Sequence, residues 1–126
     1  MALSQPGSAQ VVGKNGPSGC IDVSDAHSNV TVEGRLAEGR FTDSYGSERA
    51  FILQLPRAIC IDDGGEFADP AERFTQVHVS ATNARLFRTL RKLNGRKVII
   101  SGEGFAAHTR HHHRPLVIIA DRVTVR

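Results

Sequence analysis

The chain has 126 residues, of which 40% are hydrophobic and 23% charged, and its formal net charge is +3 at pH 7. This length allows one hydrophobic core and is short for two domains. No apolar run approaches the ~20 residues that a membrane-spanning helix needs, so the sequence excludes such a helix in this chain.

The charged residues are unevenly distributed. Residues 1–81 hold 6 basic and 11 acidic side chains, whereas residues 82–126 hold 10 basic and 2 acidic ones. This asymmetry predicts a positive side whose partners are anions or acidic surfaces. A basic helix face that contacts only water is the alternative interpretation.

The N-terminal segment differs in composition from the rest. Residues 1–19 are rich in Gly, Ser and Pro, which favours a flexible leader ahead of a single folded domain over residues 20–126. Met1–Gln10 lacks the basic start and the apolar stretch of a signal peptide. If the protein is exported, we expect this chain to be its mature part with an added Met1.

The first half of the domain is predicted to form strands. Residues 30–36 alternate apolar and polar side chains, and Gly34 at an inward position indicates a bulge that lets one strand serve both sides of a small barrel. Residues 42–48 are predicted to form a turn. A second strand is expected over residues 51–55, ended by Pro56.

Two short features follow. Ile59-Cys60-Ile61 is predicted to be a small extra strand. The acidic loop from Asp62 to Glu72 could bind calcium, but it lacks the spacing of a defined calcium loop, so a solvated loop is favoured.

The second half alternates between strand and helix patterns. Residues 77–79 predict a third strand, with His78 pointing away from Val77 and Val79. Leucines at helical spacing over residues 86–93, with capping residues before them and Gly95 after them, predict an amphipathic helix of about three turns. Residues 98–105 and 116–125 predict the last two strands.

This order of elements predicts a mostly β fold with one helix. Strand, strand, strand, helix, strand, strand is the order of a five-stranded OB-like barrel, here with a short extra strand. A small open α+β sandwich is the alternative.

The two cysteines are Cys20, after the polar leader, and Cys60, within an apolar segment. They fit one disulfide that ties the start of the domain to a strand, which would imply an oxidising compartment. Two independent thiols, one of them a small buried hydrophobe, are the alternative.

The most unusual stretch is the histidine loop, Ala107–Pro115, which contains four of the six histidines. If His111–His113 is extended, His111 and His113 share one face and His112 takes the other. With His108 across the bend, His111 and His113 could form a three-histidine site for zinc, copper or nickel.

Two other interpretations of the histidine loop remain open. The imidazoles could pack on the barrel mouth and hydrogen-bond to the loop backbone. Alternatively, Arg110 and Arg114 together with His108 and His111–His113 form an anion-binding loop whose charge rises as the pH falls through about 6.5.

The sequence gives less support to catalysis and to nucleic-acid binding. Ser80 and Ser101 lack a glycine-framed elbow, and Gly102-Glu103-Gly104 lies within a predicted strand. The chain has no Trp, one Tyr and six Phe at mostly core-like positions, which argues against nucleic-acid binding because single strands stack on exposed rings. We therefore expect no enzyme activity and no nucleic-acid partner.

The chain resembles a family of uncharacterised bacterial secreted and lipoprotein-like domains, classified as a domain of unknown function. The resemblance covers residues 20–126 and is carried by four segments: Cys20 with Val30–Leu36, Ile59–Asp62, Leu93–Val98, and His108-Thr109-x-His111-His112-His113-x-Pro115. The resemblance implies a periplasmic or secreted location, a Cys20–Cys60 disulfide and a role for the histidine loop. Arg110 and Arg114 replace the small or neutral residues expected there.

These observations predict a non-enzymatic exported binding module. We expect it to bind a protein partner or an anionic ligand of the cell envelope through the histidine loop and a basic face. The partner class includes cell-envelope-acting enzymes, for which such a module would be an inhibitor or immunity protein. A transition-metal-binding protein that uses His108, His111 and His113 is the alternative.

Overall fold

A computed structural model describes residues 11–12 and 19–126 of the chain. The elements in these residues are β1 (Val11–Val12), β2 (Ile21–Asp22), β3 (Asn29–Asp43), β4 (Gly46–Ile59), β5 (Ile61–Asp62), β6 (Phe74–Ala81), α1 (Ala84–Lys92), β7 (Lys97–Ala106) and β8 (Leu116–Val125). No helix in these residues is long and apolar enough to cross a membrane.

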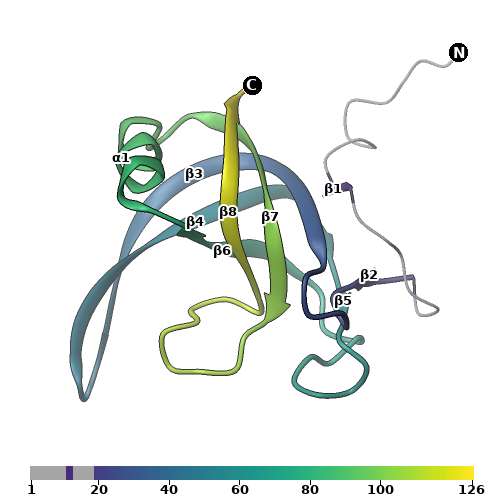
Figure 1. Cartoon of the computed structure of the whole chain (residues 1–126). Helices are drawn as coiled ribbons and strands as arrows, with labels where there is room; N and C mark the ends of the chain where they lie inside the picture. The colour runs from purple at the N-terminus through teal and green to yellow at the C-terminus, as the bar shows by residue number, and fades with distance from the viewer. Residues whose placement is uncertain (1–10, 13–18) are drawn as a thin grey trace, which may run out of the picture.

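Five strands close into a barrel. Their order is β3-β4-β6-β8-β7, and β7 returns to pair with β3. The β6–β8 pair is parallel and the other pairs are antiparallel. Because α1 lies between the third and fourth barrel strands, this topology confirms the predicted OB-like barrel. Figure 1 shows α1 at one end of the barrel and the loop between β7 and β8 at the other.

Strand β3 closes the barrel because it pairs on both sides. Its residues 29–35 pair with β7, and its residues 35–43 pair with β4. Gly34 lies at this changeover, where any β-carbon would overlap the backbone carbonyl oxygen of Gln54. The bulge predicted at Gly34 is absent, because neither ladder of β3 shifts register there, and the glycine is required by the close backbone approach.

The helix covers one end of the core. Leu90 is completely buried, and Leu86 and Leu93 pack against the same hydrophobic cluster. The Asn83 side chain accepts a hydrogen bond of 2.8 Å from the Leu86 amide and so caps the first turn. The amphipathic helix predicted from the leucine spacing is therefore confirmed.

The β3–β4 hairpin is longer than predicted. Residues 42–48 were expected to form a turn, but only residues 44–45 lie outside the strands, because Thr42 pairs with Ser47 and Asp43 with Gly46. Pro56 was expected to end β4, yet the strand continues to Ile59. The β4–β6 pairing is interrupted there, between Gln54 and Ile59, so the ladder does not need the missing proline N–H.

The predicted extra strand is divided in two. Ile59 ends β4, while Ile61–Asp62 forms β5 and pairs in parallel with β2. Just before β2 and β5, Cys20 and Cys60 form a disulfide, with 4.9 Å between their Cα atoms. This result confirms the disulfide and removes the alternative of two free thiols.

Part of the predicted N-terminal leader forms a strand. Val11 and Val12 lie within the predicted leader but pair antiparallel with Val32 and Thr31, whereas residues 1–10 and 13–18 of that leader lie outside the described residues.

In the acidic loop, burial opposes ionisation of Asp63, but hydrogen bonds from the amides of Phe67, Ala68 and Glu66 outweigh this effect and lower the pKa of Asp63. The Asp63 carboxylate therefore organises the loop backbone.

Candidate functional site

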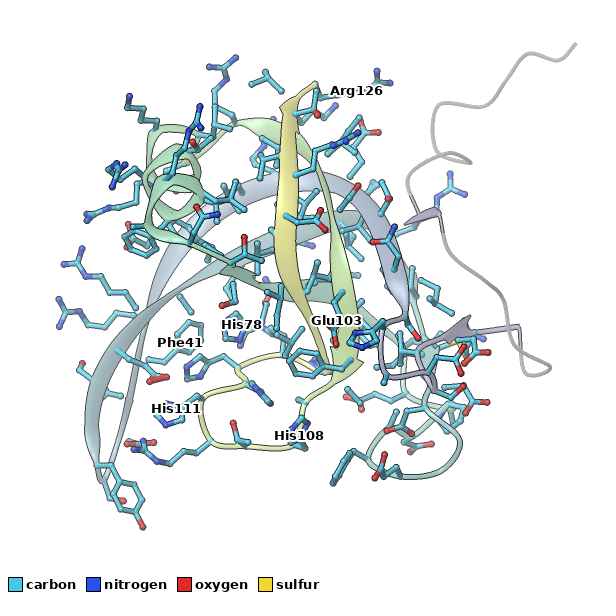
Figure 2. The ribbon with its side chains drawn as sticks, viewed as in Figure 1. Phe41, His78, Glu103, His108, His111 and Arg126 are labelled. Carbon is cyan, nitrogen blue, oxygen red and sulfur yellow. A yellow bond between two sulfur atoms is a disulfide. The ribbon has the colours of Figure 1, made fainter. Side chains whose placement is uncertain are left out.

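The histidine loop joins β7 to β8, as predicted, and lies beside the β3–β4 hairpin at the barrel end opposite α1 (Figure 1). Figure 2 shows Phe41 of the hairpin, His78 of β6 and His111 of the loop grouped at this end. The hairpin extends far enough to reach the loop because Thr42–Glu48 remains mostly strand. The site is therefore built by three separate parts of the chain.

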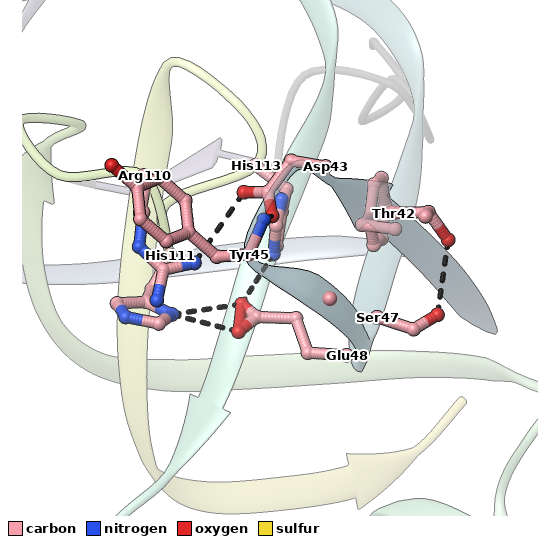
Figure 3. A pocket seen from close by; sticks show the side chains of 10 residues that line it. Thr42, Asp43, Tyr45, Ser47, Glu48, Arg110, His111 and His113 are labelled. Carbon is pink, nitrogen blue, oxygen red and sulfur yellow. Dashed lines mark hydrogen bonds and ion pairs between the residues drawn. The ribbon is translucent and has the colours of Figure 1, made fainter.

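Glu48 connects the hairpin to the loop. Its two carboxylate oxygens accept hydrogen bonds from His111 Nδ1 at 2.7 Å and from His113 Nε2 at 2.8 Å (Figure 3). Hydrogen bonding to His111, then to His113, lowers the pKa of Glu48. An ionised carboxylate accepts only, so it fixes a proton on each of these two ring nitrogens. His111 is left with Nε2 as its second hydrogen-bonding atom.

His113 is held between two rings. It stacks on Phe41 at a centroid distance of 4.1 Å and on His78 at 5.4 Å. Its backbone N–H donates to His78 Nδ1 at 3.2 Å. His78 itself is only 8% exposed and had not been assigned to the site from the sequence. The parallel pairing of β6 with β8 brings it there, opposite Val117.

Two of the imidazoles resist protonation. Burial, followed by the charges of His113 and His112, lowers the pKa of His78 to about 4. Burial and the charge of His108 also lower the pKa of His112, whose Nδ1 accepts the amides of His108 and Thr109. The expectation that the loop charge rises below pH 6.5 therefore does not extend to His112.

His108 lies apart from His111 and His113. Its Nδ1 donates to the Ala106 carbonyl at 2.9 Å. Its ring stacks on the Phe67 ring at a centroid distance of 4.9 Å and contacts the His112 ring edge-on at 4.7 Å. The structure thus does not bring together the three histidines proposed as metal ligands. In the described part of the chain, no three His, Cys, Asp or Glu side chains are arranged to hold a metal ion.

Both arginines of the loop contact the neighbouring strands. Arg110 forms an ion pair with Asp43 at 3.4 Å and lies over the Tyr45 ring at 4.4 Å. Arg114 donates to Gln76 Oε1 at 2.6 Å and to the His113 carbonyl at 2.6 Å. Arg114 therefore supports the loop, whereas Arg110 lies at its surface with 48% of its side chain exposed.

Two hollows adjoin the Glu48 bridge, by which we mean the hydrogen bonds that join Glu48 to His111 and His113. The larger, of about 350 Å³, lies between the hairpin tip and the loop and is drawn in Figure 3. Its lining side chains are Phe41, Thr42, Asp43, Tyr45, Ser47, Glu48, Arg110, His111 and His113. The second, of about 310 Å³, also contacts Glu48 and His111 and adds His78, Ser80, Phe105 and His112. Both hollows contain donor and acceptor side chains, which suits polar or charged ligand groups.

Sequence reasoning located the loop but missed Glu48, Asp43, Phe41 and His78. The carboxylates are absent from the loop's own sequence, and His111 and Glu48 are 63 residues apart. The alternating pattern of β6 did indicate that His78 leaves the core face, but it gave no link to the loop. Only the barrel topology connects them.

The site and fold define a small OB-like barrel with a clustered histidine loop. A family model described as Domain of unknown function (DUF4431) matches residues 76–124, from β6 to β8, and so includes the whole loop. The match supports an uncharacterised domain. No curated protein matches the chain.

We expect the free energy of unfolding to fall as the pH drops from about 6.5 to about 4. The unfolded chain protonates His78 near its ordinary pKa of about 6.5, whereas the folded chain does so only near a pKa of about 4, so the unfolded state binds the proton first. The full difference corresponds to about 3 kcal/mol. Denaturant unfolding at both ends of this window measures it.

The matched variants for this test are His78→Gln and His27→Gln. His78→Gln keeps an acceptor for the His113 amide and should remove most of the pH dependence, whereas His27, whose side chain is 89% exposed, should not matter. An unchanged slope in His78→Gln would show that another group is responsible.

We expect zinc to bind this loop more weakly than micromolar. His108 is separate, and His111 and His113 lie 2.7–2.8 Å from the Glu48 oxygens, a hydrogen-bond spacing. Ligands of one tetrahedral metal would lie roughly 3.3 Å apart. Calorimetric titration tests this; submicromolar one-to-one binding, lost in His111→Ala, would contradict it.

Proposed function

We propose that this protein is a non-enzymatic binding module that is exported to the periplasm or secreted. It binds a protein partner, as an inhibitor or immunity protein of a cell-envelope-acting enzyme would, or an anionic ligand of the envelope. The binding residues are those of the histidine loop, His108, Arg110, His111, His112, His113 and Arg114, together with a basic face. The basic face consists of Arg40, Arg49, Arg85, Arg88, Arg91 and Lys92, on the hairpin and α1.

The observation that carries this proposal is the Glu48 bridge. One carboxylate holds His111 and His113 against the hairpin, and stacking on Phe41 fixes the His113 ring. A loop ordered in this way before binding loses less conformational entropy when a partner docks. The exposed Arg110 and the adjoining hollow of about 350 Å³ then provide charge and shape for recognition.

The disulfide supports the proposed location. Cys20 and Cys60 are bonded and buried, and such structural disulfides persist in oxidising compartments. The periplasm and the exterior of the cell are compartments of this kind. The location is therefore part of the proposal.

The hydrogen bonds around His111 favour binding over catalysis. A carboxylate on His111 Nδ1 does orient the imidazole, as in enzymes that use histidine as a base. However, the Thr42 and Ser47 hydroxyl groups that line the hollow hydrogen-bond to each other at 3.0 Å. The Tyr45 ring is covered by Arg110. This arrangement supports a recognition surface.

Partner recovery with matched variants tests the proposal. The untagged protein and its variants are immobilised, and envelope proteins are recovered at low and at high salt. We expect a protein or anionic ligand that is retained by the wild type and by His27→Ala, is lost with His111→Ala, and binds more weakly as salt rises. Equal recovery with His111→Ala would contradict a role for the loop.

A further inference from the structure

The basic face lies on the other side of the β3–β4 hairpin from the histidine loop. Side chains alternate along a strand, so Phe41 and Glu48 project to the loop side, whereas Arg40 and Arg49 project to the α1 side. The exposed side of α1 adds four cationic side chains, Arg85, Arg88, Arg91 and Lys92. The two surfaces adjoin at Arg49, which also lines the hollow beside His111 and His112. The cationic side chains of α1 lie at the opposite end of the barrel from the loop, so the two surfaces can bind different partners.

Within the described residues, only one carboxylate forms ion pairs with the basic face. Glu38 lies 3.9 Å from Arg91 and 4.0 Å from Arg49, and it is shared between them. The register places Arg40 directly opposite Arg49, an arrangement of like charges that destabilises an antiparallel pair. A bound anion would relieve this repulsion.

A hollow is present where that anion would bind. It has a volume of about 220 Å³ and is lined by Glu38, Gly39, Arg40, Arg49 and Asn94. Guanidinium groups recognise phosphate through paired hydrogen bonds. Five of the six cationic side chains of the basic face are arginines. This composition favours a phosphate ligand.

The basic face also contains an exposed aromatic ring. Phe87 of α1 is 44% exposed, contacts Phe51 edge-on at 5.5 Å, and lies 5.9 Å from the Arg91 guanidinium. An exposed apolar ring beside cationic side chains is a feature of surfaces that lie at the bilayer interface. A soluble acidic partner would use the charges but would not need the ring.

We infer that the basic face binds the surface of an anionic phospholipid bilayer, with the arginines on phosphates and Phe87 at the acyl boundary. This inference rests on the proposed function and names an anionic envelope ligand of the basic face, distinct from the partner of the histidine loop. The disulfide, which indicates an oxidising compartment, disfavours nucleic acid as the source of the phosphates. Each basic side chain near such a surface strengthens binding about fivefold.

The full chain is tested with phosphatidylcholine vesicles, with and without phosphatidylglycerol. We expect binding only when phosphatidylglycerol is present. Arg85→Glu combined with Arg88→Glu should weaken it by at least about 30-fold, because two attractions become repulsions. The matched control, Arg57→Glu with Arg122→Glu, makes the same charge change at exposed positions outside the basic face and should retain most of the binding.

The absence of Trp from the chain allows a second readout. In the Phe87→Trp variant, the single indole should shift its emission to the blue with anionic vesicles and not with inorganic phosphate or polyglutamate. Equal binding to pure phosphatidylcholine, equal weakening by the control variant, or binding of polyglutamate without vesicle binding would overturn the inference.

These experiments test the lipid inference and the role of the histidine loop independently. If vesicle binding is absent while loop-dependent partner recovery persists, only the lipid inference is overturned. If vesicle binding is present and recovery does not depend on His111, only the role of the loop is overturned.

Discussion

Replacing Cys20 and Cys60 together by alanine should lower the free energy of unfolding by about 4 kcal/mol. The disulfide closes a loop with a sequence separation of 40 residues, and removing it restores that loop's conformational entropy to the unfolded chain. It also joins β2 to β5, a two-stranded sheet outside the barrel. Denaturant unfolding of the two proteins measures the difference.

Reduced wild-type protein is the control for this variant. Reduction removes the cross-link and leaves both sulfur atoms in place, so it separates the entropic effect from lost packing. We expect the two losses to agree within about 1 kcal/mol. A double variant as stable as the oxidised wild type would show that the disulfide does not stabilise the domain.

Gly34→Ala should destabilise the barrel by about 3 kcal/mol or more. The added methyl group would overlap the Gln54 carbonyl oxygen, a backbone atom that cannot move without disturbing the β3–β4 ladder. Gly39→Ala is the comparison, because its nearest atoms belong to the Phe41 ring at 3.2 Å, a side chain that can shift. Thermal unfolding should therefore show a much smaller loss for Gly39→Ala, and equal losses would contradict this explanation.

Local patterns in the sequence predicted most of the fold. The leucines of α1 repeat at helical spacing, and apolar runs mark β7 and β8, so these elements could be located before their neighbours were known. The order of the elements then favoured one barrel topology. The ends of β4 were missed because Ser47 and Glu48 have no strand-like pattern and Pro56 commonly ends a strand.

The candidate site could be predicted only in part, because its contacts are long-range. The histidine loop was visible as a composition, but its partners Phe41 and Glu48 come from a hairpin more than 60 residues earlier. No local pattern encodes such pairing. The prediction that His108 lies beside His111 depended only on an expected bend in the loop. In the structure, His108 packs against Phe67 instead.

We propose that the histidine loop recognises a partner and does not hold a metal. Native mass spectrometry of untagged protein, purified from its natural compartment together with a His111→Ala variant, tests this most directly. We predict a mass that corresponds to a bound protein or anionic ligand in the wild type, lost in His111→Ala, and no stoichiometric metal in either protein. One equivalent of zinc, copper or nickel in the wild type, lost in His111→Ala, would instead identify the loop as a metal site.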